Sequence, residues 1–105
     1  MFLETPKYNI LYEKDEYSKL MEDYVKLLMD RDIPMIISNK TREVVGIEQN
    51  NQLVQSYEFD YNNPLYFTDI YHISWEGRKE FTNTLKGVMQ WGKAGSSWGY
   101  SFEHE

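Results

Sequence analysis

Two acidic residues, Glu58 and Asp60, have the spacing in this sequence that is most suggestive of chemistry. Residues two positions apart in a strand share a face and lie about 7 Å from each other. Paired carboxylates can hold a divalent cation or act as acid and base. The acid-x-lysine element that a nuclease would add is missing, since Glu76-Gly77-Arg78-Lys79 has the wrong spacing. We therefore interpret the pair as a solvated acidic strip, then as a contact surface, and only last as catalytic.

The other residues with chemical potential lack partners in sequence. His72 is expected on a strand, where Asp69 falls on the opposite face by parity, and a general base would need a carboxylate delivered by the fold. Residues 103–105 (Glu-His-Glu) fall short of the three or four fixed ligands that a metal site requires. Residues 92–97 contain Gly, Lys and Ser in the wrong order for a phosphate-binding loop. The sequence predicts no catalytic residue, no metal site and no cofactor.

The composition favours surface recognition over catalysis. Nine Tyr, five Phe and three Trp accompany only two His and no Cys, and acidic residues outnumber basic ones by 17 to 11. Tyr and Trp bury large areas while keeping a polar group. The net charge of −6 opposes attraction to nucleic acid and anionic lipid, but it permits binding to a basic surface. We expect a cytoplasmic protein that contacts neither membranes nor, directly, nucleic acid.

The clearest local signal is a stripe of apolar residues with helical spacing, which predicts a helix from about Lys14 to Asp30. Pro34 limits its far end, because the residue before proline avoids helical backbone angles. The stripe consists of Tyr17, Leu20, Met21, Tyr24, Leu27 and Leu28.

Strands are expected on both sides of this helix and in the middle of the chain. Residues 8–12 and 35–37 are short apolar runs, and residues 43–48 and 52–61 flank Asn50-Asn51, a pair that fits a hairpin turn. Alternation puts Leu53, Tyr57, Phe59 and Tyr61 on one face of the second arm. Residues 66–74 are rich in aromatic and β-branched side chains and predict a further strand.

A second helix is predicted after Ser74, which has the properties of an N-cap. Its apolar stripe is Phe81, Leu85, Val88 and Met89, and Gly92 or Gly95 ends it. Short connections then indicate an α+β fold, with an antiparallel sheet of three or four strands and two amphipathic helices packed on one face. We expect a single domain over residues 1–105, with 1–7 and 93–105 less ordered than the rest.

Aromatic residues also alternate along the C-terminal tail, at Trp98, Tyr100 and Phe102. They are compatible with a last strand or a return onto the core, and also with a segment that anchors a partner. Self-association into a homodimer would bury such side chains as well.

Two stretches, Asp23–Ile33 and Tyr71–Phe81, resemble parts of a winged-helix domain. The step Ser74-Trp75-Glu76-Gly77 is similar to one in an uncharacterised prophage-associated family with winged-helix character. The resemblance covers about a quarter of the chain and implies a phage or prophage origin. The helix in the recognition position lacks the clustered Arg and Lys of groove binders, so no binding residue is carried over.

These observations predict a small acidic protein-binding module without enzymatic activity, acting as a phage or mobile-element inhibitor of a host or defence protein. A nucleic-acid-binding enzyme is one such target, because carboxylates can stand in for phosphates. Alternatives are a degenerate winged-helix DNA-binding accessory protein, with a basic strip at Lys40, Arg42, Arg78 and Lys79, and a small-ligand, nucleotide-like sponge. The predicted partner-binding residues are Tyr57, Glu58, Asp60, Tyr61, Tyr66, Asp69 and Trp98.

Overall fold

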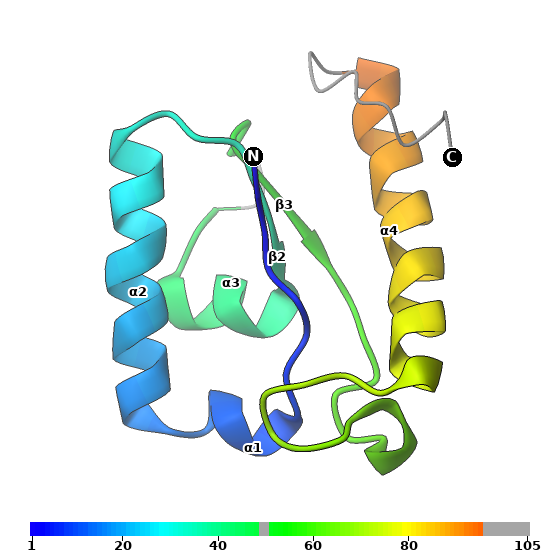
Figure 1. The fold of residues 1–105 in the computed structure, drawn as a ribbon. Coiled ribbons are helices and arrows are strands. Elements are labelled where there is room, and N and C mark those ends of the chain that lie inside the picture. The colour runs from blue at the N-terminus through cyan, green and yellow to red at the C-terminus, as the bar shows by residue number, and fades with distance from the viewer. Residues whose placement is uncertain (49–50, 96–105) are drawn as a thin grey trace.

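The computed structural model of the 105-residue chain describes residues 1–48 and 51–95 (Figure 1). Strands and helices alternate along most of this part of the chain. In order, the elements are β1 (Phe2–Leu3), α1 (Asn9–Tyr12), α2 (Asp15–Asp30), β2 (Met35–Ser38), α3 (Asn39–Val45), β3 (Val54–Tyr57), the 3-10 helix η1 (Pro64–Tyr66) and α4 (Trp75–Gly95). The aromatic tail at Trp98, Tyr100 and Phe102 lies outside the described residues.

The three strands form a parallel sheet in the order β1-β2-β3, so the prediction of an antiparallel sheet is wrong. Leu3 lies opposite Ile36 and Ile36 lies opposite Gln55. Each connection between strands contains a helix, which is the crossover that parallel neighbours require. The hairpin expected between residues 43–48 and 52–61 is also wrong, because the first of these segments begins inside helix α3 (Asn39–Val45).

Half of the segment expected as a strand at 43–48, residues 43–45, belongs instead to helix α3. The Ser38 hydroxyl accepts a hydrogen bond from the backbone N–H of Thr41 (3.0 Å), which caps the first turn. Gly46 ends α3 in the left-handed conformation, at a φ of 77°. These two local signals override the β-branched composition of the segment.

The N-terminal residues provide one edge of the sheet. Phe2–Leu3 form β1, and Glu4 and Pro6, which follow it, are buried. Residues 9–12 form the short helix α1, so the strand expected at 8–12 is wrong. The Tyr12 ring of α1 turns into the core, where it packs edge-on against Tyr61.

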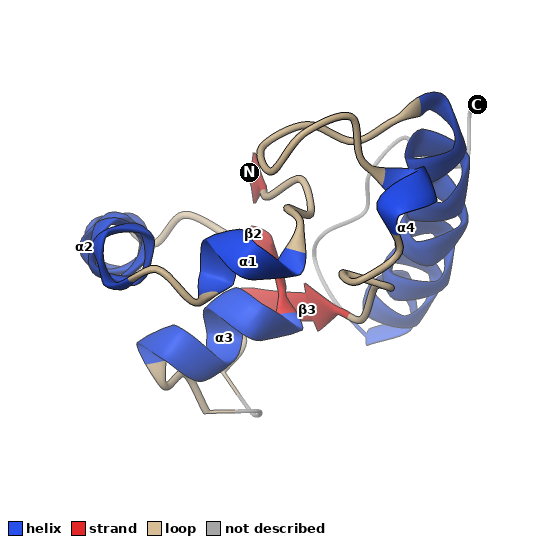
Figure 2. Cartoon of the chain, turned by 90° about the horizontal axis from the view of Figure 1, so that it is seen from below, coloured by secondary structure: helices blue, strands red, loops and turns tan. Residues whose placement is uncertain are grey.

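Helices cover both faces of the sheet, whereas the sequence predicted helices on one face only (Figure 2). Helices α2 and α3 pack on the face of Met35 and Ile37, and α1 and α4 pack on the face of Ile36 and Tyr57. Successive strand residues point to opposite faces, so a strand covered on both sides is buried at every position. All four residues of β2 are buried accordingly, and the one polar residue, Ser38, is hydrogen-bonded.

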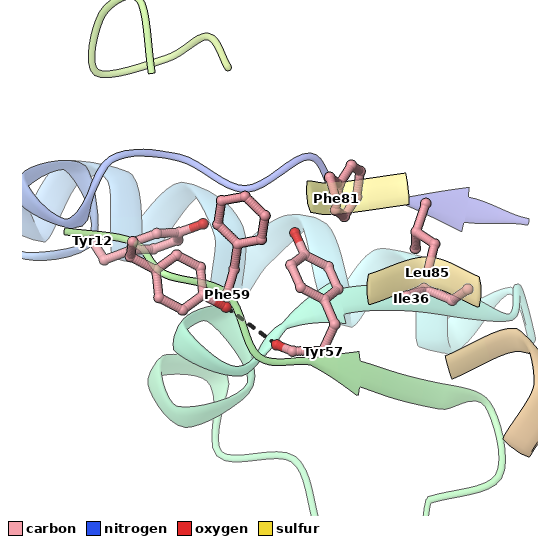
Figure 3. Packing of buried hydrophobic residues seen from close by; sticks show 7 residues of the cluster. Tyr12, Ile36, Tyr57, Phe59, Phe81 and Leu85 are labelled. Atoms are coloured by element: carbon pink, nitrogen blue, oxygen red, sulfur yellow. Dashed lines mark hydrogen bonds between the residues drawn. The ribbon is translucent and has the colours of Figure 1, made fainter. Parts of the chain in front are cut away.

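Aromatic rings dominate the core between the sheet and α4 (Figure 3). Phe81 lies 5.1 Å from Tyr57 and 6.2 Å from Phe59, measured between ring centroids. The Tyr61 hydroxyl donates to the Tyr57 carbonyl oxygen (3.2 Å), the dashed line in Figure 3. The cluster comprises Tyr12, Ile36, Tyr57, Phe59, Tyr61, Phe81 and Leu85.

The two long helices lie close to where their stripes predicted them, but α2 is rotated relative to the expectation. Its buried residues are Met21, Val25 and Leu28, while Leu20 and Leu27 are exposed. No helix in the described part of the chain combines the length and apolar character needed to cross a bilayer.

Residues 66–74 form no regular strand, and a single bridge joins Phe67 to Ile73. Helix α4 begins at Trp75, and the Ser74 hydroxyl accepts a hydrogen bond from the Gly77 N–H (3.1 Å). The cap predicted at Ser74 is confirmed.

Candidate functional site

The carboxyl ends of parallel strands are the usual place for a ligand, and here the protein fills that edge itself. Glu4 follows β1 and is only 3% exposed. Its carboxylate accepts hydrogen bonds from the Ser38 N–H (2.7 Å) and the Thr41 hydroxyl (2.8 Å), at the start of α3. The Tyr57 hydroxyl donates to the Glu4 carbonyl oxygen (2.7 Å). This edge is thus a closed structural network.

The environment of Glu4 changes its acidity. Burial raises the pKa of its carboxyl group above the ordinary value of 4.5, and the hydrogen bonds from Ser38 and Thr41 oppose that shift. Burial and the nearby Glu4 charge also hold the pKa of Tyr57 well above its ordinary value. We assign these groups to the stability of the fold, because none of them faces solvent.

Two of the residues predicted to bind a partner belong to the core. Tyr57 and Tyr61 are buried in the aromatic cluster, so their rings are not available to a partner. The predicted alternation is only partly correct: Tyr57, Phe59 and Tyr61 do share one core cluster, but β3 ends at Tyr57 and Leu53 packs in the other cluster. Phe81 and Leu85 of α4 pack against these rings. Trp98 lies outside the described residues.

The structure does bring Glu58, Asp60 and Tyr66 together, in a hollow of about 220 Å³. A third carboxylate, Glu80 from α4, joins them, and Phe59 and Thr84 complete the lining. We call this set of six residues the acidic hollow. Both predicted acids, Glu58 and Asp60, are exposed, because β3 has ended at Tyr57 and the chain leaves the sheet there.

The three carboxylates of the acidic hollow are free of cations within the described structure. None of them forms an ion pair with another described residue, and Glu58 accepts a hydrogen bond from the Asn39 amide (2.6 Å). Across residues 1–48 and 51–95, no three His, Asp or Glu side chains are arranged to hold a metal ion. Among the described residues, no ion pair therefore neutralises the negative charge of the hollow.

Two apolar side chains project from the segments next to the acidic hollow. Leu65 is 72% exposed and Trp75 is 68% exposed, the highest values among the large apolar residues described. Leu65 precedes Tyr66 of the hollow, and its carbonyl oxygen accepts a hydrogen bond from the Ser74 hydroxyl, beside Trp75 (2.5 Å). We call Leu65 and Trp75 the apolar pair. Lys79 lies over the Trp75 ring, 5.8 Å from its centroid.

A close backbone contact fixes η1 against α4 and so sets the position of the apolar pair. The Ser74 N–H donates to the Tyr66 carbonyl oxygen (2.8 Å). A Cβ atom at Gly77 would lie 2.1 Å from that same oxygen, so only glycine fits here. Leu65 and Trp75 are therefore held by rigid contacts although their side chains are in solvent.

Asp69, another predicted contact residue, lies in a turn instead. Its Oδ1 accepts hydrogen bonds from the N–H groups of Tyr71 (2.7 Å) and His72 (2.9 Å), and it meets the His72 Nδ1 at 2.9 Å. The Tyr71 N–H and the His72 ring lower the pKa of the Asp69 carboxyl group. The sequence placed the two side chains on opposite faces of a strand, and the turn brings them together.

The basic strip that a DNA-binding alternative requires is not assembled. Arg42 is buried, and its guanidinium donates to the Ser56 hydroxyl (3.0 Å) and to the Glu48 carbonyl oxygen. Arg78 and Lys79 are on α4, across the sheet from α3, which carries Lys40. The four side chains do not form one surface.

Sequence reasoning missed Leu65, Trp75 and Glu80 as surface residues. Trp75 had a usable signal, because it follows the Ser74 cap and the first turn of a helix is often exposed. Glu80 had none, since its approach to Glu58 depends on how α4 packs over the sheet.

No protein-family model, curated protein or solved structure matches this chain.

Proposed function

We propose that this chain is a non-enzymatic protein-binding module, and that its contact surface is the apolar pair together with the acidic hollow. The observation that carries the proposal is the exposure of Leu65 and Trp75, the most exposed large apolar side chains described, on the two elements η1 and α4 that also supply Tyr66 and Glu80 to the acidic hollow. Exposed apolar side chains clustered beside polar groups are typical of interaction sites.

The apolar pair has the properties of a binding anchor. Trp is strongly enriched among the residues whose removal costs an interface most, and a fixed backbone reduces the entropy lost on binding. The contact between Gly77 and Tyr66 supplies that fixed backbone. A partner with an apolar pocket would bury both side chains.

The acidic hollow specifies the charge of the partner. Glu58, Asp60 and Glu80 complement Lys or Arg side chains around the partner's pocket, and such complementarity raises association rates and excludes acidic competitors. A basic nucleic-acid-binding enzyme of a host or defence system fits this description, with the carboxylates placed where phosphates would bind. A phage or mobile-element inhibitor would act in this way.

The test is quantitative affinity capture from a lysate of the host cell. The wild-type chain is the bait, and two variants are compared with it. Trp75→Ala removes the apolar anchor, and the double variant Asp60→Asn/Glu80→Gln removes two of the three negative charges of the acidic hollow. We expect one stoichiometric partner to be retained by the wild type and lost by both variants, with binding that weakens as salt is added.

Leu20→Ala is the matched control, because Leu20 is also a highly exposed leucine but lies on α2. The control should retain the partner in full. Retention by Trp75→Ala, loss in the control, or absence of any stoichiometric partner would each contradict the proposal.

A further inference from the structure

A second hollow, of about 580 Å³, lies where the segment after β1 meets the loop before α4. Its volume is in the range of small-molecule sites, which is about 300–1,000 Å³. Its lining includes the basic residues Lys7, His72 and Arg78, and Tyr71, Ile73 and Phe81 provide aromatic and apolar surface. It therefore offers cationic groups and a ring surface within one site.

This hollow is a local exception in a chain with a net charge of −6. None of its lining residues is acidic. Of the neighbouring acids, Asp69 is bonded to His72, and Glu4 is buried with its carboxylate bonded to Ser38 and Thr41. Burial lowers the pKa of Lys7, while Glu4 opposes this shift. A partly buried ammonium group gains from a bound anion.

The hollow is preformed by contacts between its walls. The Tyr8 N–H donates to the Ile70 carbonyl oxygen (3.3 Å), and the Tyr8 ring packs edge-on against Phe67 (5.4 Å between centroids). These contacts join the residues next to Lys7 to the loop that carries Tyr71 and His72, and the two segments run side by side in Figure 1. Asp69 additionally fixes the orientation of the His72 ring.

We infer that this hollow binds a mononucleotide, with its phosphate held by Lys7 and Arg78 and its base against Tyr71. Arg and Lys are the usual phosphate ligands, and charge-assisted hydrogen bonds to phosphate are among the strongest in proteins. The Tyr71 side chain is half exposed and presents a flat ring for stacking. His72 is a further hydrogen-bonding group for the phosphate oxygens.

Isothermal titration calorimetry with AMP tests the inference on the purified chain. We expect saturable binding of one AMP per chain, weakened about tenfold or more by Arg78→Gln, since a hydrogen bond to a charged group is lost. Arg78 is exposed, so this variant should fold as the wild type does. Tyr71→Ala should weaken AMP binding and leave the binding of inorganic phosphate unchanged.

Lys79→Gln is the control, because it removes the same charge one position along α4, from a side chain that lies over Trp75. It should bind AMP as the wild type does. Absence of saturable AMP binding overturns the inference. An equal loss of AMP affinity in Lys79→Gln overturns the inference too, because it would show that AMP is attracted by the overall positive charge of this surface and not by Arg78 in particular. Far tighter binding of a single-stranded oligonucleotide than of AMP overturns the assignment to a mononucleotide.

Discussion

The Glu4 carboxylate and the Ser38 N–H lie 2.7 Å apart although 34 positions separate them in the chain. Their hydrogen bond joins the end of β1 to the end of β2 and the start of α3. The Thr41 hydroxyl and, at 3.4 Å, the Tyr12 hydroxyl meet the same carboxylate. One acidic side chain thus joins the N-terminal segment, α1 and α3 at the edge of the sheet.

The first prediction concerns this buried carboxylate. Glu4→Leu leaves the Ser38 N–H without its partner and removes the acceptor of the Thr41 hydroxyl, and each buried unpaired group costs about 1–3 kcal/mol. We expect the free energy of unfolding in urea to fall by about 2–4 kcal/mol. Glu43→Leu changes an exposed acid on α3 and should cost less than about 0.5 kcal/mol. Equal losses in the two variants would contradict the assigned network.

The second prediction concerns the pH dependence of stability. Burial raises the pKa of Glu4 in the folded chain above 4.5, so the folded state holds this proton more tightly than the unfolded state. The protonated Glu4 side chain therefore stabilises the folded state. Its contribution to the free energy of unfolding is complete below pH 4.5 and is lost as the pH rises through the pKa of Glu4 in the folded chain.

The measurement for this second prediction is urea unfolding of wild type and Glu4→Gln across the acidic range. The difference in unfolding free energy, wild type minus variant, should decrease with rising pH and then level off. A difference that increases with pH would mean that the hydrogen bonds from Ser38 and Thr41 outweigh burial.

The third prediction contrasts two glycines of α4. A Cβ at Gly77 would meet the Tyr66 carbonyl oxygen at 2.1 Å, whereas a Cβ at Gly87 has no atom within 4 Å. Gly87→Ala should raise the free energy of unfolding by about 0.5–1 kcal/mol, because alanine favours the helix. Gly77→Ala should lower it by about 1–3 kcal/mol, because η1 or the start of α4 must shift.

Thermal or urea unfolding of both glycine variants checks this third prediction. The fluorescence of Trp75 should also change in Gly77→Ala, because the start of the helix is displaced. The Trp75→Phe variant gives the contribution of the other two tryptophans, which is subtracted. Stabilisation by alanine at both positions would show that η1 does not pack against Gly77.

The predictions that hold from sequence are those set by neighbours along the chain. Helix α2 occupies Asp15–Asp30, and Ser74 caps α4, because periodicity, capping and the proline at 34 act within a few residues. The rotation of α2 was missed, since Val25 and Leu20 are both apolar and only packing against the sheet selects the first. The strand expected at 43–48 is wrong because β-branched residues favour a strand, and the Ser38 cap and the Gly46 end of α3 outweigh that preference.

The sequence by itself determined the acidic net charge, the abundance of aromatic side chains that form the core, the two long helices and the exposure of Glu58 and Asp60. Only the tertiary structure decided that the strands are parallel, that Tyr57 and Tyr61 are buried, and that Glu80 joins the acidic hollow. The tertiary structure also decided that Lys7 and Arg78 line the same second hollow. The physical reason is that each of these features depends on how segments far apart in the sequence pack against one another. That packing is set by the burial of many side chains together, and no local pattern in the sequence records it.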